Sequence, residues 1–266
     1  MTTGVRKWGK MHTIDYKDLG VMPYGECLAK QHALFERMLA RQHEAAAADD
    51  GFAGTVLMVE HDPVYTLGKS GKESNLLVDE ARLRALGAEF HHIDRGGDIT
   101  FHGRGQIVCY PILDLGRLGI GLRRYIEILE QAVIDTIAHY GICGRRLEGA
   151  TGVWICDDYA PQAQCAEGDT AEKTPAKECE GRHWRKICAI GVRASRYVTM
   201  HGLALNVATD LRWFTMINPC GFTDKGVTSI AKEVGTDKVG IGEVKALLLS
   251  NLTRLLGVAT EEDEKN

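Results

Sequence analysis

The 266-residue sequence contains no apolar run that approaches the roughly 18 residues needed to span a bilayer. Residues 1–7 lack the apolar core of a signal peptide. The sequence also lacks a basic excess, since its formal net charge is −4, whereas nucleic-acid-binding proteins usually carry a surplus of Lys and Arg. These absences argue against membrane and nucleic-acid partners and predict a cytoplasmic protein.

Paired cysteine motifs are missing as well. None of the eight cysteines forms a C-x-x-C pair, so neither a zinc ribbon nor a thioredoxin-like site is indicated. In a reducing cytosol the expected state of each cysteine is a free thiol. Most such thiols behave as small buried hydrophobic groups, although one of them can still serve as a nucleophile.

Helices and strands alternate along the chain. Hydrophobic periodicity predicts helices over residues 23–47, 79–86, 121–140 and 242–256. Strands are predicted over residues 55–60, 88–94, 106–113, 151–156, 186–194 and 199–207. Pro111 indicates that strand 106–113 lies at a sheet edge or contains a bulge. This order of elements predicts an α/β (α+β) fold, a single domain over residues 1–266 with a central mixed sheet flanked by helices.

Two segments differ from the rest in composition. Residues 157–182 hold seven acidic residues against three basic ones and few large apolar side chains. Such a stretch cannot bury enough surface to order itself strongly, so we expect residues 157–183 to form an acidic surface insertion. The alternative is a zinc site, whose ligands would be Cys165 and Cys179 with Cys156 or His183, although their spacing is unlike common zinc sites. Residues 258–266 are expected to form a flexible tail.

A glycine-rich segment at residues 95–106 follows a predicted strand directly. Glycine permits positive φ and lets a ligand approach the backbone closely. The polar residues Arg95, Thr100 and His102 lie between the glycines. The spacing matches neither the P-loop nor the G-x-G-x-x-G pattern. The segment is therefore either a ligand-binding loop or a structural turn.

Lys186 opens a strand of small and apolar residues. Alternate residues of a strand share one face, so Lys186, Cys188 and Ile190 point together. A lysine in this position is either a strand-end residue that extends its amine to solvent or a lysine whose pKa is tuned by burial or a partner.

Two further segments contain candidate functional residues. Gly202 follows His201 in a predicted strand, where a glycine indicates close approach of another group, and a lone histidine is more often structural than a base. Cys220 lies in a tight turn between Pro219 and Gly221, and exposure in such a turn is a condition for thiolate chemistry. An inert thiol and a nucleophile remain alternatives for Cys220.

Together these segments resemble the lipoyl(octanoyl) transferase family. The motifs are Arg-Gly-Gly-x-x-Thr-aromatic-His-Gly at 95–103, Lys-Ile-x-x-x-Gly at 186–191, His-Gly-Leu-Ala-Leu-Asn at 201–206 and Asn-Pro-Cys-Gly at 218–221. Residues 60–66 and 152–154 agree with the same family. The resemblance extends over about residues 12–256, outside the insertion and the tail.

The resemblance implies a fold like that of the biotin and lipoate protein ligase catalytic domains. It implies that Cys220 is the nucleophile and that Lys186 activates it. The implied substrate-binding residues are Arg95, Gly96, Gly97, Asp98, Ile99, Thr100, Phe101, His102, Ala189, Ile190, Gly191, Gly202, Leu203 and Ala204. Ile99, Ile190 and Leu203 are candidates to line a tunnel for the acyl tail.

The resemblance also implies the partners. The octanoyl donor is octanoyl-acyl carrier protein, and the acceptors are lipoyl domains of 2-oxoacid dehydrogenase E2 subunits and the glycine cleavage H protein. No metal and no nucleotide cofactor is implied, because the donor thioester is already activated. Backbone N–H groups near Cys220 and Ala189–Gly191 are candidates to bind the developing oxyanion.

Departures and rival functions accompany this interpretation. Arg104 stands where the family usually has proline, which adds a charge and frees a backbone angle.

One rival function is that of an ATP-dependent lipoate or biotin protein ligase, which needs a phosphate-binding loop and no cysteine at position 220. A second is a cysteine hydrolase with His102 or His201 as its base, and a third is a carrier-protein-binding module without activity.

Overall fold

The structure is a computed structural model that describes residues 12–44, 50–156, 174, 181–219, 224–236 and 239–261. Cys220 lies outside the described residues, and so does most of the acidic segment 157–183, including Cys165 and Cys179. None of the helices in the described part of the chain is long and apolar enough to cross a membrane.

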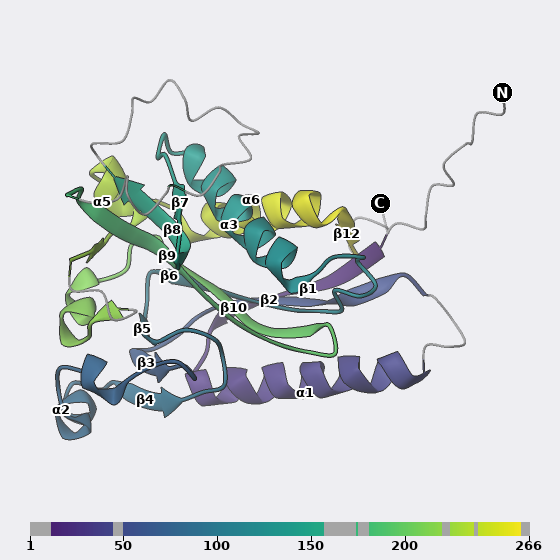
Figure 1. Ribbon diagram of the computed structural model, residues 1–266, viewed down its shortest axis with the longest axis horizontal. Helices are drawn as coiled ribbons and strands as arrows, with labels where there is room; N and C mark the ends of the chain where they lie inside the picture. Colours follow the sequence, from purple (N-terminus) through teal and green to yellow (C-terminus); the bar gives the residue numbers. More distant parts are fainter. Residues whose placement is uncertain are drawn as a thin grey trace.

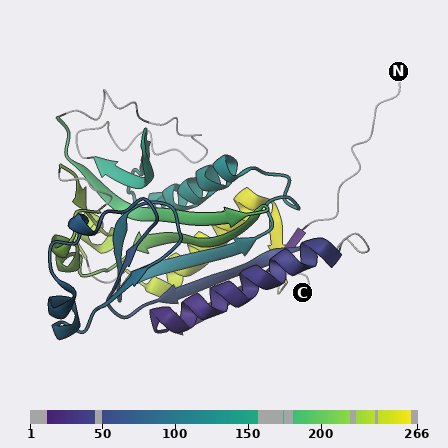
Figure 2. The same ribbon diagram turned by 60° about the horizontal axis from the view of Figure 1, so that its bottom comes forward.

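One mixed sheet of nine strands forms the centre of the fold (Figures 1 and 2). The strands are β1 (His12–Val21), β2 (Phe52–Glu60), β6 (Gln106–Leu113), β7 (Arg145–Leu147), β8 (Ala150–Cys156), β9 (Trp184–Ser195), β10 (Val198–Asn206), β11 (Gly226–Val227) and β12 (Val258–Thr260). Their order is β12-β1-β2-β6-β10-β9-β8-β7, with β11 beside β9. β1 pairs in parallel with β2 and β12, whereas β2, β6, β10, β9 and β8 pair antiparallel in succession.

Helices cover both faces of this sheet (Figure 1). α1 (Tyr24–Glu44) packs on one face, where its buried Cys27, Phe35 and Met38 contact side chains of β2, β6 and β10. α3 (Leu122–Ala138) and α6 (Ile241–Leu256) lie together on the opposite face and bury their apolar stripes in the larger core cluster. Each helix thus removes one apolar side from water, which is the main stabilising term of the fold.

A smaller sheet lies beside one end of the main sheet. It consists of β3 (Val64–Leu67), β4 (Glu89–His92) and β5 (Ile99–His102) in the order β4-β3-β5. The short elements α2 (Glu80–Ala85), η1 (Glu73–Asn75), η3 (Leu211–Met216) and α5 (Ile230–Val234) complete the described fold. Phe101 of β5 stacks on Trp213 of η3 with ring centroids 5.4 Å apart, in a cluster that also contains Tyr65 and Phe214. This packing holds β5 in place against η3.

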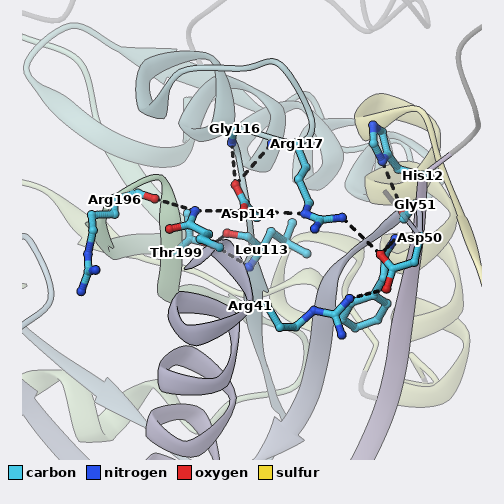
Figure 3. Close-up of polar contacts among 12 residues, drawn as sticks. His12, Arg41, Asp50, Gly51, Leu113, Asp114, Gly116, Arg117, Arg196 and Thr199 are labelled. Atoms are coloured by element: carbon cyan, nitrogen blue, oxygen red, sulfur yellow. Dashed lines mark hydrogen bonds and ion pairs between the residues drawn. The ribbon is translucent and has the colours of Figure 1, made fainter. Parts of the chain in front are cut away.

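A polar network around Asp114 fixes the end of the sheet away from the small sheet (Figure 3). The Asp114 carboxylate accepts hydrogen bonds from the backbone N–H groups of Gly116 at 2.9 Å and Arg117 at 3.2 Å. Gln42 of α1 donates to the same carboxylate at 2.9 Å and to the Arg196 carbonyl at 2.8 Å. Asp114 is only 3% exposed, and these bonds compensate its burial while connecting α1 to the β9–β10 hairpin.

The predicted fold class is confirmed, because a central mixed sheet is flanked by helices. Three finer predictions are wrong. β6, which carries Pro111, is a central strand between β2 and β10 and not an edge strand. The paired residues of β6 and β10 end at Cys109 and Leu203, before Pro111, so the missing N–H of Pro111 costs no hydrogen bond of that ladder. Val258–Thr260 form β12 instead of a flexible tail. Cys143 is disulfide-bonded, whereas Cys27, Cys109, Cys156 and Cys188 are the expected free thiols.

Candidate active site

A pocket opens where the glycine-rich segment meets β9 and β10. Its water-accessible cavity has a volume of about 50 Å³. Its walls are formed by Tyr24, Ile93, Arg95, Gly97, Asp98, Ile99, Thr100, His102, Val108, Tyr110, Ala189, Ile190, Gly191, His201, Gly202, Leu203 and Ala204. Most of the lining surface belongs to apolar and small residues, which suits an apolar ligand with few polar contacts.

Arg95 connects the glycine-rich segment to the small sheet. Its guanidinium donates hydrogen bonds to the carbonyl of Thr66 at 2.7 Å, to the Thr66 hydroxyl at 3.1 Å and to the Gly96 carbonyl at 2.9 Å. Arg95 is 8% exposed, so these bonds replace much of the water that the charge loses. Because these hydrogen bonds go to backbone and side-chain groups of Thr66 and Gly96, Arg95 holds the pocket wall in shape.

Glycines allow the glycine-rich segment to approach β9. The Gly96 N–H donates to the Val192 carbonyl at 2.9 Å. A Cβ atom at Gly191 would lie 2.8 Å from the Gly96 carbonyl oxygen and 2.9 Å from the Arg95 Cδ. Real Cβ atoms do not come this close to a backbone oxygen, so Gly191 is required for the contact. The pocket therefore depends on a backbone-to-backbone approach that larger residues would block.

Aromatic and histidine side chains gather at one end of the pocket. His61 and His102 lie 6.1 Å apart between ring centroids, and Tyr24 stacks with His102 at 6.3 Å. The His61 ring contacts the Met22 carbonyl at 2.8 Å through Nδ1 and the Tyr110 hydroxyl at 2.9 Å through Nε2. Nδ1 is therefore the protonated nitrogen of His61, and the Tyr110 hydroxyl donates to Nε2.

Burial keeps these groups uncharged. It lowers the pKa of His102 to about 3, with a further contribution from nearby His61. Burial likewise lowers the pKa of His61 and raises the pKa values of Tyr24 and Tyr110. At neutral pH this end of the pocket is polar but neutral, so it can accept an uncharged chain without leaving a buried ion unpaired.

The depressed pKa of His102 predicts a pH dependence of stability. The unfolded chain protonates its histidines below pH 6.5, whereas folded His102 stays neutral down to about pH 3. The contribution of His102 to the free energy of unfolding is therefore fully present above pH 6.5. It decreases as the pH falls below 6.5, by up to about 1.4 kcal/mol per pH unit. We expect His102→Gln to reduce the loss of unfolding free energy between pH 7 and pH 5 by about 2 kcal/mol, measured by urea denaturation.

His92, whose side chain is 60% exposed, provides the matched control. His92→Gln should leave the pH dependence within about 0.5 kcal/mol of the parent protein. Equal pH dependence in the His102→Gln and parent proteins would contradict the burial argument.

Lys186 lies at the other end of the site, on β9. It is 6% exposed, and its Nζ lies 4.6 Å from the centroid of the Trp154 ring and 3.4 Å from the Thr151 carbonyl oxygen. Gly152 lies beside it: its φ is +122°, and a Cβ atom there would lie 3.7 Å from the lysine Cε and 2.5 Å from the Cys188 carbonyl oxygen. Lys186 therefore has a defined position and is not an amine that extends freely into solvent.

A second, smaller cavity at Lys186 shares wall residues with the pocket. Its lining includes Lys186, Pro219 and Val227 together with Thr100, Ala189 and Ala204, and the last three also line the larger pocket. β11 pairs in parallel with β9, with Val227 opposite Lys186. The N–H of Thr228 donates to the Lys186 carbonyl at 3.0 Å. Pro219 precedes Cys220 in the sequence and β11 follows it, and both lie close to Lys186.

At Gly202 the backbone of β10 lies too close to the backbone of β6 to leave room for a side chain. A Cβ atom at Gly202 would lie 2.1 Å from the Cys109 carbonyl oxygen and 2.7 Å from Cδ of Pro111. We expect Gly202→Ala to lower the free energy of unfolding by roughly 1–3 kcal/mol, because β10 must shift to accommodate the methyl group. The same shift would move Leu203 in the pocket wall and reduce transfer activity.

Gly242, in the first turn of α6, offers a matched control because a Cβ atom there would meet nothing within 4 Å. Gly242→Ala should be neutral or stabilising by up to about 1 kcal/mol, since alanine favours a helix more than glycine does. Thermal unfolding of both variants measures the difference. A Gly202→Ala protein as stable as the Gly242→Ala protein would contradict the close approach.

The structure brings most of the predicted substrate-binding residues together. Those that line the pocket are Arg95, Gly97, Asp98, Ile99, Thr100, His102, Ala189, Ile190, Gly191, Gly202, Leu203 and Ala204. Gly96 and Phe101 do not line it: Gly96 holds the loop to β9, and the Phe101 ring packs against Trp213. Lys186 lies in the adjoining cavity, and Cys220 is outside the described residues.

Sequence reasoning missed part of the pocket wall. Tyr24, Ile93, Val108 and Tyr110 line it without having been predicted. His201 was interpreted as a structural histidine or as the base of a hydrolase, and not as a residue of the substrate pocket. His201 has φ = +62° within a strand, which is costly for a residue with a Cβ atom, and its Nε2 lies 3.1 Å from the Asp94 carboxylate. Burial lowers the pKa of His201 to about 4. No local sequence signal marks this conformation, apart from the adjacent Gly202.

The sequence has clear relatives among known proteins. Residues 23–253 match the model of the lipoyl protein ligase A/B catalytic domain family. An octanoyltransferase of Bacteroides fragilis is 48% identical over 231 residues, covering 87% of this chain and 92% of the relative. An octanoyltransferase of Bacteroides thetaiotaomicron is 48% identical over 239 residues, covering 90% and 93%. One of Flavobacterium psychrophilum is 46% identical over 245 residues, covering 91% and 96%.

Solved structures agree on the fold. A lipoate-protein ligase A bound with ATP superimposes with a TM-score of 0.60 at 14% identity, covering 96% of this chain and 92% of that one. The bipartite lipoate protein ligase of Thermoplasma acidophilum gives a TM-score of 0.61 at 15% identity, covering 96% and 90%. At these identities the likeness concerns the fold alone.

Proposed function

The chain belongs to the octanoyltransferases of the lipoyl protein ligase A/B catalytic domain family and is an acyltransferase, and we propose that it transfers the octanoyl group through a thioester on Cys220. In the first half-reaction the Cys220 thiolate attacks a donor thioester, and the donor thiol leaves. In the second half-reaction the ε-amine of an acceptor lysine attacks the Cys220 thioester and forms an amide. A thiolate suits both halves because it is a good nucleophile and a good leaving group.

Lys186 would supply the proton chemistry of this cycle. A cysteine with an ordinary pKa of about 8.5 is mostly protonated at neutral pH, so a nearby amine is needed to take its proton. The resulting ammonium would stabilise the thiolate and then protonate the departing donor thiol. In the second half-reaction the neutral amine would accept a proton from the incoming lysine.

The observation that carries this proposal is that the two cavities share wall residues. The larger pocket has an apolar lining suited to an acyl chain, and through Thr100, Ala189 and Ala204 it adjoins the cavity of Lys186 and Pro219. An acyl chain in the pocket would therefore have its carbonyl end near Lys186. Each buried CH₂ group contributes about 0.8 kcal/mol, so an eight-carbon chain can contribute several kcal/mol of binding free energy.

We further propose the partners of this reaction. The donor would be octanoyl-acyl carrier protein, and the acceptors would be lipoyl domains of 2-oxoacid dehydrogenase E2 subunits and of the glycine cleavage H protein. The octanoyltransferase relatives and the match to the lipoyl protein ligase family support an acyl donor and lipoyl-domain acceptors in general. The reaction as proposed consumes no ATP.

ATP independence is the direct test against a ligase. The purified protein is mixed with octanoyl-acyl carrier protein and a lipoyl domain without ATP, and octanoylation of the domain is measured by mass spectrometry. We expect complete transfer under these conditions and none from free octanoate with ATP. The reverse pattern would replace the proposal with the ligase function.

The same assay addresses a cysteine hydrolase. The candidate bases His102 and His201 have pKa values lowered by burial to about 3 and about 4, so both are weak bases at neutral pH. We expect release of free octanoate to be far slower without the lipoyl domain than transfer is with it. Hydrolysis at the rate of transfer would favour the hydrolase.

A further inference from the structure

Two buried amide side chains line the cavity at Lys186. Gln106, the first residue of β6, is 1% exposed, and Asn206, the last residue of β10, is 4% exposed. The Gln106 amide donates to the Asn206 amide oxygen at 2.8 Å and to the Phe101 carbonyl at 3.1 Å. The Asn206 amide in turn donates to the Thr228 carbonyl at 2.9 Å.

Backbone carbonyls fix the direction of both amides. A carbonyl oxygen only accepts hydrogen bonds, so the Gln106 atom beside Phe101 and the Asn206 atom beside Thr228 are the NH₂ groups. Gln106 therefore presents its oxygen to Nδ1 of His102 at 2.8 Å, which agrees with the neutral state of that ring. Both N–H groups of Gln106 have acceptors. Only one N–H of Asn206 has an acceptor among the described residues.

The spare N–H belongs to a residue of the cavity at Lys186. Gln106 and Asn206 line this cavity together with Lys186, Ala189 and Pro219. Thr228, which accepts from Asn206, also donates its backbone N–H to the Lys186 carbonyl. Asn206 is thus held at a fixed position relative to the Lys186 backbone and to the chain that follows Cys220.

We propose that Asn206 is a further catalytic residue, whose spare Nδ2–H stabilises the oxyanion of the transfer reaction, and that Gln106 is its positioning residue. This inference rests on the proposed function at Cys220. When the thiolate forms a C–S bond to the donor carbonyl carbon, the C=O π electrons move to oxygen, which receives the Asn206 hydrogen bond. When the carbonyl re-forms, the donor C–S bond breaks, and the departing thiolate takes a proton from Lys186.

Transition-state stabilisation of this kind predicts a specific kinetic signature. The hydrogen bond to the oxyanion becomes stronger in the transition state. Loss of its N–H group therefore lowers the rate of the chemical step by about 10²–10³-fold, with little change in the binding of octanoyl-acyl carrier protein. Single-turnover mass spectrometry with octanoyl-acyl carrier protein measures the acylation rate at Cys220 and its dependence on donor concentration. We expect Asn206→Ala to lose rate by this factor at an almost unchanged half-saturating donor concentration.

A second variant separates catalysis from folding. Asn206→Ala leaves the Gln106 N–H and the Thr228 carbonyl unpaired. Gln106→Leu with Asn206→Leu removes the Gln106 N–H but unpairs the Phe101 carbonyl and Nδ1 of His102, so the two variants differ in stability while both lack the donor. The double variant lacks the donor, so its acylation should stay as slow as that of Asn206→Ala. Asn251→Leu, in α6, is the matched amide control and should acylate at the parent rate.

The outcomes are distinguishable. An acylation rate within threefold of the parent in either folded variant would overturn the role of Asn206. A rate that recovers together with stability in the double variant would reduce Asn206 to a structural residue, which also overturns it. If the parent protein itself forms no acyl-enzyme at Cys220, the proposed function fails, and that result is visible before any variant is measured.

Discussion

Replacement of Cys220 by alanine is expected to lower the rate of octanoyl transfer by at least about 10⁴-fold. Without the thiol no acyl-enzyme can form, and loss of a covalent nucleophile typically removes most of the catalytic power of a site. The residual rate would come from binding the donor and acceptor close together. The measurement is the initial rate of lipoyl-domain octanoylation from octanoyl-acyl carrier protein.

Cys156 provides the matched control. It is a half-buried free thiol on β8 and does not line the pocket or the adjoining cavity. Cys156→Ala should transfer octanoyl groups at close to the parent rate. A Cys220→Ala protein that retains more than a tenth of the parent rate would show that transfer proceeds without this thiol.

Replacement of Lys186 by methionine is expected to lower the transfer rate at pH 7 by about 10²–10⁴-fold, the usual contribution of a general acid–base group. Methionine keeps much of the side-chain volume beside Trp154 but cannot exchange protons. The remaining activity should rise with pH as the Cys220 thiol ionises near its ordinary pKa of about 8.5. The pH profile of the acylation rate, measured with saturating donor, tests this prediction.

Two further variants identify the role of Lys186. Lys186→Arg keeps the positive charge but cannot act as a base, so it should remain strongly impaired if proton transfer is the main contribution. Lys245 is another buried lysine, paired with Asp18 at 2.7 Å, and it lines neither the pocket nor the adjoining cavity. Lys245→Met should lower stability but not the transfer rate per folded molecule. An active Lys186→Arg protein would mean that charge alone suffices.

Strongly periodic elements could be predicted from the sequence. The helix predicted over residues 121–140 is α3, Leu122–Ala138, because its apolar residues follow a 3–4 spacing that only a helix can bury on one side. The strand predicted over 199–207 is β10, Val198–Asn206. The missed strands are β1, β3, β5, β7, β11 and β12. All of them except the ten-residue β1 hold two to four residues, too few for a periodic signal.

Gly202 could be predicted as a position of close approach, because the sequence places a glycine inside a strand, and another backbone passes there too close for a Cβ atom. Gly191 was indicated only by the family resemblance, although the same geometry explains it. The aromatic end of the pocket was not predictable. Tyr24 begins α1 and Tyr110 lies in β6, and only the tertiary fold brings them to His102.

The departure at Arg104 also has a structural explanation. Its guanidinium donates two hydrogen bonds to the Asp62 carboxylate, at 2.9 Å and 2.8 Å. Both side chains are more than half exposed, so the pair contributes at most about 1 kcal/mol. This contact holds the loop after β5 to the segment before β3. The proline that the family usually has at this position would instead restrict the backbone of the loop.

The most direct test of the account is the mass of the intact protein after reaction with octanoyl-acyl carrier protein in the absence of ATP. The account predicts an increase of one octanoyl group, located on Cys220 by peptide mapping and transferred to the lipoyl domain when that domain is added. Octanoylation of the lipoyl domain without any adduct on Cys220, or an adduct that the domain does not discharge, would contradict the proposed thioester route.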